Sequence, residues 1–272
     1  MNEISPVTPE SDCGARTEKA WYHRPLPLAL LLVVLYIFLS SAYAVHMPDW
    51  QPYDEPWHFT NIDILARENR QAVLEESTEA HQPPLYYWLM SLAVGEDTPY
   101  ENICPRLRLL SALLFGPAFV IVLFCALGAF LKIRWLHAAL LSFILINIPM
   151  FLAVAGSITN DTAALLFSAL AFLFMAYSRG RESLLPHTLM GAAAGLALLS
   201  KGTCLFLGPT ILLFYILERT PLPRRAAAAA ACLAATMAFA GWWYIRNIIV
   251  YGDPTGSSAM VGYFEATSVN IL

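Results

Sequence analysis

Side chains that could do chemistry are scarce in this chain, because 58% of its 272 residues are hydrophobic and only 13% are charged. Carboxylates and imidazoles exchange protons and bind metal ions, whereas lysine and arginine bind anions. A few such groups lie at the borders of long apolar segments, and they are few enough to be considered one by one. They are Asp54, Glu55, His58, His81, Gln82, Asp161, Lys201 and Arg246.

Each of these residues also has a plainer structural interpretation. Asp54 and Glu55 could cap a surface helix, and Asp161 could belong to the cap of the helix that follows it. His81 stands before two prolines, which end helices. Lys201 could extend its ammonium group to the membrane surface. An ionised group at the edge of the hydrocarbon usually pairs with another charge or with a substrate, and we expect the same of Asp161 and Lys201.

The elements that hold these residues are membrane-spanning helices. The mean hydropathy is +0.56, and a soluble domain usually carries about 25% charged residues, nearly twice the share found here. A helix of roughly 20 apolar residues crosses a bilayer. We therefore predict an all-α polytopic membrane protein, and the net charge of −4 argues against binding nucleic acid. Five long windows contain no Asp, Glu, Lys or Arg: 25–48, 109–131, 135–160, 162–178 and 226–245.

Two segments leave the number of spans open. Segment 80–95 is uncharged but short and begins with prolines, and segment 183–217 contains one charge, Lys201. The second segment could be one buried helix or a hairpin that turns at Ser200-Lys201-Gly202. The distribution of basic residues favours the hairpin and a non-spanning 80–95. The seven predicted spans are 25–47, 107–131, 135–157, 161–178, 184–199, 203–218 and 226–245.

This arrangement gathers the basic turns on one face of the membrane. The tail 1–24 and the turns near residues 132, 180 and 222 hold ten of the 16 basic residues and six of the 20 acids. We assign this face to the cytoplasm, with the N-terminus inside. The opposite face receives loop 46–106, the two short turns at Asp161 and Lys201, and segment 246–272. Within the loop we predict an amphipathic surface helix at 56–74 and a second interfacial helix at 83–95.

Five sequence motifs follow one another along the chain: PYDEPWHF, HQPPLYYWL, SITND, LLSKGT and WWYIRNIIVYGDP. Together and in this order they resemble the GT-C superfamily of membrane glycosyltransferases. The chain looks most similar to the bacterial family-39 type, which is similar to protein O-mannosyltransferases and the lipid A aminoarabinose transferase. The resemblance extends over most of residues 25–256.

The resemblance implies transfer of a sugar from a polyprenyl phosphate to an acceptor hydroxyl at the outer face, with inversion. Asp54 matches the acidic residue that serves as general base, and Glu55 is the second member of that acidic pair. The remaining matched positions would contact the donor, and the two basic ones would neutralise its leaving phosphate. The expected donor-binding residues are His81, Gln82, Tyr87, Asp161, Lys201 and Arg246. The expected partners are the lipid-linked sugar, membrane lipid and a glycan, lipid or protein acceptor.

Several alternatives stay open on the sequence alone. Related enzymes usually continue with further spans, so we expect the chain to be a truncated product, a fragment or a subunit that needs a C-terminal partner. A non-catalytic subunit that binds lipid-linked sugar, and a transporter, are the competing functions. We predict no cofactor and no disulfide framework, and a divalent metal held by Asp54, His58 and His81 is a minor alternative. The expected location is the inner (plasma) membrane, with the site on the external side.

Overall fold

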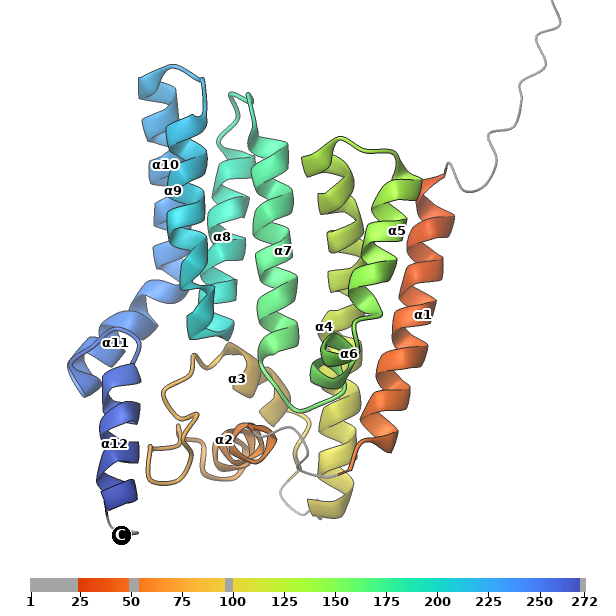
Figure 1. Ribbon diagram of the computed structural model, residues 1–272. Coiled ribbons are helices and arrows are strands. Elements are labelled where there is room, and N and C mark those ends of the chain that lie inside the picture. The colour runs from red at the N-terminus through yellow and green to blue at the C-terminus, as the bar shows by residue number, and fades with distance from the viewer. Residues whose placement is uncertain (1–23, 49–53, 96–99, 270–272) are drawn as a thin grey trace, which may run out of the picture.

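Every regular element that the structure describes is a helix. The computed structural model describes residues 24–48, 54–95 and 100–269, and these residues contain no strand. Helices α1, α4, α5, α7, α8, α9 and α10 run side by side in one bundle, and α2 lies across one end of it beside α3 (Figure 1). The helices are α1 (Pro25–His46), α2 (Glu55–Glu68), α3 (Leu85–Ser91), α4 (Tyr100–Leu131), α5 (Trp135–Ile146), α6 (Pro149–Ala155), α7 (Asp161–Ser178), α8 (Leu185–Ser200), η2 (Gly202–Phe206), α9 (Leu207–Leu217), α10 (Leu222–Thr236), η3 (Met237–Gly241), α11 (Trp242–Tyr251) and α12 (Ser257–Val269).

Each of the seven predicted spans coincides with a helix or a broken helix. Four are long and apolar enough to cross a bilayer by themselves, namely α1, α4, α7 and the continuous segment Leu222–Tyr251. A fifth is the bent pair α5 and α6. The segments Leu185–Ser200 and Gly202–Leu217 are apolar but shorter, with 10–17 residues each, so seven spans stay a prediction.

The hairpin interpretation of segment 183–217 is confirmed. The α8 helix ends at Ser200, Lys201 adopts an extended backbone with φ −152° and ψ 133°, and the chain re-enters a helical conformation at Gly202. The turns at Asp161 and Lys201 lie at the same end of the bundle as α2 and α3 (Figure 1). The turns after α4, α7 and α9 lie at the other end (Figure 1). They hold Arg134, Arg179, Arg181 and Arg219, and Arg224 and Arg225 follow in the first turn of α10.

The boundaries of three predicted elements are wrong. The surface helix ends at Glu68 rather than at residue 74, because Asn69 takes a left-handed conformation with φ 51°. The second surface helix has seven residues, Leu85–Ser91, in place of 83–95. The span 135–157 breaks before Pro149, where α5 and α6 meet at 72°, since proline cannot continue the hydrogen-bond ladder. The predicted tail falls on residues 1–23, outside the described residues.

Small residues bring helices into direct backbone contact. In α8, Gly191 and Gly195 form a small-xxx-small pair that faces the α10 and η3 segment. A Cβ atom on Gly191 would lie 2.0 Å from the carbonyl oxygen of Cys232. The hydroxyl of Thr236 donates to the Gly191 carbonyl oxygen across the same interface, at 3.0 Å. The two helices therefore depend on the absence of a side chain at position 191.

Candidate active site

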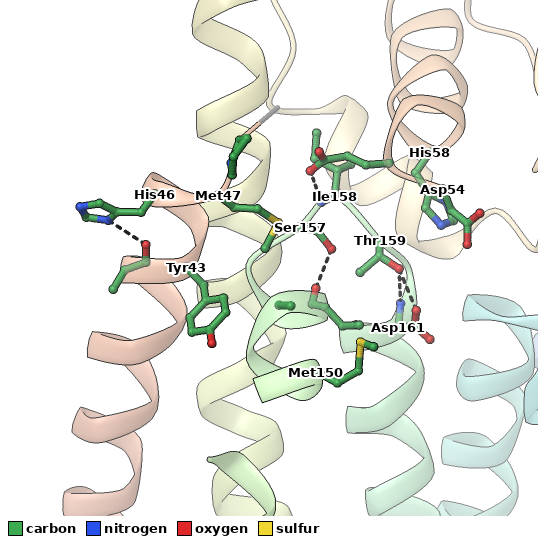
Figure 2. A pocket seen from close by; sticks show the side chains of 15 residues that line it. Tyr43, His46, Met47, Asp54, His58, Met150, Ser157, Ile158, Thr159 and Asp161 are labelled. Carbon is green, nitrogen blue, oxygen red and sulfur yellow. Dashed lines mark hydrogen bonds between the residues drawn. The ribbon is translucent and has the colours of Figure 1, made fainter. Parts of the chain in front are cut away.

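One large cavity opens at the bundle end that carries α2 and α3. Its volume is about 990 Å³, and it is bounded by the last turns of α1, by α6, by the start of α2 and by the loop that enters α7. Figure 2 shows Asp54 and His58 on one side and Tyr43 and His46 of α1 on the other. We call it the acidic cavity. It is lined by Ala42, Tyr43, His46, Met47, Pro48, Asp54, Glu55, His58, Met150, Ala153, Val154, Ser157, Ile158, Thr159 and Asp161.

Asp54 stands at the N-cap position of α2 without acting as a side-chain cap. Its backbone carbonyl accepts hydrogen bonds from the amides of Trp57 and His58, but its carboxylate makes no capping hydrogen bond. Asp54 is exposed and lines the acidic cavity one helical turn before His58. The interpretation of this residue as merely a helix cap therefore loses its main physical support.

Glu55, in contrast, is fully buried and bound on every side. Both of its carboxylate oxygens accept hydrogen bonds from Arg108 of α4, at 2.8 Å from Nε and 2.5 Å from Nη2. The Ile158 amide donates to the same carboxylate at 3.0 Å. The Arg108 guanidinium also donates to the carbonyl oxygens of Met47 and Pro48. Glu55 thus joins α2, α4, the end of α1 and the loop before α7, which fixes the walls of the acidic cavity.

Arg108 is the main residue that the sequence analysis missed. It falls at the start of the predicted span 107–131 and was not proposed as a site residue, whereas its side chain is nearly as buried as that of Glu55. The sequence feature that could have identified Arg108 as a buried residue is its position as a charged residue within the first turns of the long apolar helix α4. A buried arginine requires a buried acceptor, and the acidic pair was the nearest candidate in the loop.

Asp161 and Lys201 form an ion pair with each other, which is one of the two alternatives that their positions at the hydrocarbon edge left open. The Lys201 ammonium lies 2.7 Å from Oδ1 of Asp161, and Thr159 donates to Oδ2 at 2.9 Å. The side chain of Lys201 is 20% exposed and that of Asp161 is 34% exposed, so water and ligand can reach both. Asp161 lines the acidic cavity directly, and Lys201 is attached to its wall through Asp161. Lys201 is thus connected to the cavity that contains Asp54 through Asp161, without lining it.

His58 and Tyr87 form a buried pair beneath Asp54. The Nδ1 atom of His58 lies 2.8 Å from the Tyr87 hydroxyl, and their rings stack with centroids 5.8 Å apart. Burial, with a smaller contribution from the positive charge of Lys201, lowers the pKa of His58 to about 3. Burial also raises the pKa of Tyr87. Both groups are neutral at physiological pH, and Tyr87, which we expected at the donor, binds His58 instead.

His81 and Gln82 line a second, smaller cavity of about 360 Å³ at the same end of the bundle. The Nδ1 atom of His81 lies 3.0 Å from the Thr78 carbonyl oxygen, and Oε1 of Gln82 accepts the Gly202 amide at 3.4 Å. Gln82 thus holds the turn that presents Lys201. The cavity, which we call the His81 cavity, is completed by Pro83, Gly202, Thr203, Leu205, Trp243, Tyr244, Asn247, Thr255 and Ser257.

Arg246 lies beside the His81 cavity, between two aromatic rings. Its guanidinium is 4.9 Å from the ring centre of Trp243 and 5.1 Å from that of Tyr251, and it donates to Oδ1 of Asn247 at 2.9 Å. No carboxylate in the described part of the chain forms an ion pair with it. Cation–π contacts orient the guanidinium but leave its net charge available to an anion.

The predicted site residues therefore divide into two groups. Asp54, Glu55 and Asp161 line the acidic cavity, while His81 and Gln82 line the other cavity. Among residues 24–48, 54–95 and 100–269, no three His, Cys, Asp or Glu side chains are grouped to hold a metal ion. The minor metal alternative at Asp54, His58 and His81 consequently has no geometric support within the described residues.

The fold and the two cavities define a polytopic helical membrane protein with its polar chemistry at one end. The sequence model of the dolichyl-phosphate-mannose-protein mannosyltransferase family matches residues 81–245, and the chain belongs to this family, a member of the GT-C superfamily. It is a membrane glycosyltransferase in the broad sense of that family. The matched residues include Asp161 and Lys201 but neither Asp54 nor Arg246. No curated protein and no solved structure matches the chain.

Proposed function

We propose that this protein transfers a sugar from a polyprenyl phosphate to an acceptor hydroxyl in the acidic cavity, with inversion at the anomeric carbon. The observation that carries the proposal is the two-sided lining of this one cavity. Asp54 and Asp161 form a polar side, while Ala42, Ala153 and Val154 belong to an apolar wall. The wall reaches the bundle surface at Met150, which is 71% exposed. A lipid-linked sugar has the same two-sided chemistry, and it could enter from the bilayer past α6.

In the proposed reaction Asp54 is the general base. The acceptor oxygen attacks the anomeric carbon, the bond between that carbon and the phosphate oxygen breaks, and the lipid phosphate leaves with the bonding electrons. The acceptor proton passes to the Asp54 carboxylate. Its negative charge also stabilises the oxocarbenium character of the transition state. Neutral His58 does not compete for the proton, because its pKa is far below physiological pH.

Glu55 takes a positioning role in this proposal rather than a catalytic one. Its two oxygens are already occupied by Arg108 and Ile158, so it has no free acceptor for an incoming hydroxyl proton. What it does is hold the first turn of α2, and therefore Asp54, against the end of α1 and the loop before α7. Of the acidic pair that the resemblance implies, we therefore propose Asp54 as the catalytic member and Glu55 as the positioning member.

Lys201 and Arg246 are proposed to stabilise the leaving phosphate. Lys201 can exchange Asp161 for a phosphate oxygen, because its side chain is 20% exposed and Asp161 lines the acidic cavity. Arg246 has no carboxylate partner among the described residues and faces the same end of the bundle. We place this end at the external side of the plasma membrane, since the turns rich in arginine lie at the opposite end.

Transfer from a radiolabelled polyprenyl-phosphate sugar tests the proposal. Asp54→Asn keeps the shape and hydrogen-bonding capacity of the side chain but cannot accept the proton, so we expect a loss of about 10²–10⁴-fold in rate with donor binding retained. Asp63→Asn is the matched control, because Asp63 lies on the same helix, pairs with Arg67 at 2.7 Å and is outside the cavity. An active Asp54→Asn protein would refute the mechanism. Donor binding without transfer in the parent protein would favour a non-catalytic subunit.

A further inference from the structure

A third cavity lies at the end of the bundle opposite the acidic cavity. It has a volume of about 510 Å³ and is bounded by the turn between α7 and α8 and the turn between α9 and α10. These two turns stand side by side at the upper end in Figure 1. We call it the arginine cavity. Its lining residues that the argument uses are Arg181, Leu184, His187, Arg219, Arg224 and Arg225.

The arginine cavity carries an excess of positive charge. Four arginines and two glutamates line it, which leaves two positive charges unbalanced. Arg224 forms an ion pair with Glu182, and Arg225 donates to the carbonyl oxygen of Glu218 at 2.9 Å. Arg181 lies over the ring of Tyr177 at 5.3 Å, and neither it nor Arg219 forms an ion pair with a carboxylate of the described residues. A backbone carbonyl does not neutralise Arg225, so Arg181, Arg219 and Arg225 all lack an ion pair with a carboxylate of the described residues and share the excess charge.

The floor of the cavity is rigid and polar. The Nδ1 atom of His187 lies 2.9 Å from the Tyr215 hydroxyl, which in turn donates to the Ala228 carbonyl oxygen at 3.1 Å. The first turns of α8 and α10 open toward the cavity, so two helix amino termini add partial positive charge to the arginines. A positively charged hollow with a fixed floor suits a phosphate group better than a flat basic surface does.

Exposed leucines flank the two turns that bound the cavity. Leu184 lines the cavity itself, and Leu184, Leu185, Leu217 and Leu222 are between 46% and 69% exposed. In a chain that spans the membrane, such leucines favour contact with acyl chains. Basic groups in a hollow beneath exposed leucines match a ligand with a phosphate on one side and acyl chains on the other.

From these observations we propose that the arginine cavity binds the phosphate headgroup of an anionic phospholipid from the leaflet at that end. The general preference for basic residues on the cytoplasmic side explains the number of arginines at this end of the bundle. It does not explain why four of them line one cavity that is flanked by exposed leucines. This lipid site is separate from the acidic cavity, and the inference does not depend on the transfer reaction.

Lipid binding to the full chain in nanodiscs tests the proposal. The probe is spin-labelled phosphatidylglycerol, with spin-labelled phosphatidylcholine as the neutral comparison. We expect preferential retention of phosphatidylglycerol, reduced about 30-fold by the double change Arg181→Gln and Arg219→Gln, since each basic residue near a lipid surface contributes about fivefold. The single change Arg219→Gln should give about a fivefold loss.

The matched control is the double change Lys132→Gln and Arg134→Gln, in the turn between α4 and α5 at the same end. It removes the same charge and should leave the preference nearly unchanged. An equal loss in both double variants would show an effect of surface charge alone and would overturn the proposal. Equal retention of phosphatidylglycerol and phosphatidylcholine by the parent protein would also overturn the proposal. Displacement of phosphatidylglycerol by millimolar inorganic phosphate would identify the ligand as a free anion.

Discussion

Glu55 and Arg108 are 53 residues apart in the chain and form a buried two-point ion pair, with 0% and 3% of their side chains exposed. The pair also binds the Ile158 amide and the Met47 carbonyl oxygen, so four segments meet at it. Breaking one half of such a pair leaves an uncompensated charge in a dry place, which is strongly destabilising.

Arg108→Met should therefore destabilise the protein by about 3–5 kcal/mol, because Glu55 would remain buried without its partner. Thermal unfolding in detergent measures the change. Adding Glu55→Gln to Arg108→Met should recover part of the loss, since the amide is neutral and its oxygen can still accept the Ile158 amide. A double variant less stable than Arg108→Met would show that the pair is not the cause.

Removal of either proposed phosphate-binding cation should weaken the donor complex. Lys201→Ala and Arg246→Ala should each reduce affinity for a polyprenyl-phosphate sugar by about 10- to 150-fold, the range of a charge-assisted hydrogen bond. Equilibrium binding of a fluorescent donor measures this. Arg67→Ala removes a positive charge from the same end of the molecule, where Arg67 pairs with Asp63, and should change affinity little.

His58 makes stability depend on pH in a predictable direction. Its pKa is about 3 in the folded protein and near 6.5 when unfolded, so between these values the unfolded chain binds one more proton. Stability should therefore fall as pH falls below about 6.5, by about 1.4 kcal/mol per pH unit from this residue. The pH dependence of Tm should be shallower in His58→Gln than in the parent, while His46→Gln, which changes an exposed histidine, should keep the parent slope.

The backbone contact between α8 and α10 gives a sharp steric test. Gly191→Ala should lower Tm, because its Cβ would meet the Cys232 carbonyl at 2.0 Å and the helices would have to separate. Gly208→Ala in α9 is the control, since no atom lies within 4 Å of the added carbon. If both changes shift Tm equally, helix propensity rather than close packing would explain the result.

Labelling of single cysteines tests the predicted orientation. In a chain whose own five cysteines are replaced by alanine, Glu75→Cys should react with a membrane-impermeant maleimide added from outside, and Ser183→Cys should not. Both residues are exposed, and they lie at opposite ends of the bundle (Figure 1). Reaction of Ser183→Cys in intact cells would reverse the orientation or change the parity of the spans.

Much of the helical framework could be predicted from the sequence, since apolar length and the placement of basic turns depend on local composition. The hairpin around Lys201 followed from the distribution of basic residues. The cost of a charge at the hydrocarbon edge predicted that Lys201 and Asp161 would each bind another charge or a substrate, and the structure shows them paired with each other. The boundaries of the surface helices did not, because Asn69 ends α2 by a backbone conformation that no hydropathy pattern records.

The internal partners of the site were also beyond the sequence. Asp54 and Glu55 are neighbours of the same charge, yet the first turn of α2 directs one carboxylate into the cavity and the other onto Arg108. Which of the two is free depends on the position of α4, more than 50 residues later. Likewise, tyrosine is a residue type that often contacts sugars, and only the packing of α3 on α2 shows that Tyr87 binds His58.

The break before Pro149 changes how the protein must fit its bilayer. With 12 residues, α5 is about 18 Å long, whereas α1 beside it has 22 residues and reaches about 33 Å. The hydrocarbon layer is about 30 Å thick. The α5 helix is therefore shorter than this layer on the side of the protein where α6 turns away. Thinning of the bilayer there is one way to match the shorter helix, and it is the one that we expect. The resulting dip in the membrane surface would lie against the apolar wall of the acidic cavity, and we expect bilayers of short acyl chains to bring lipid phosphates nearest to Asp54.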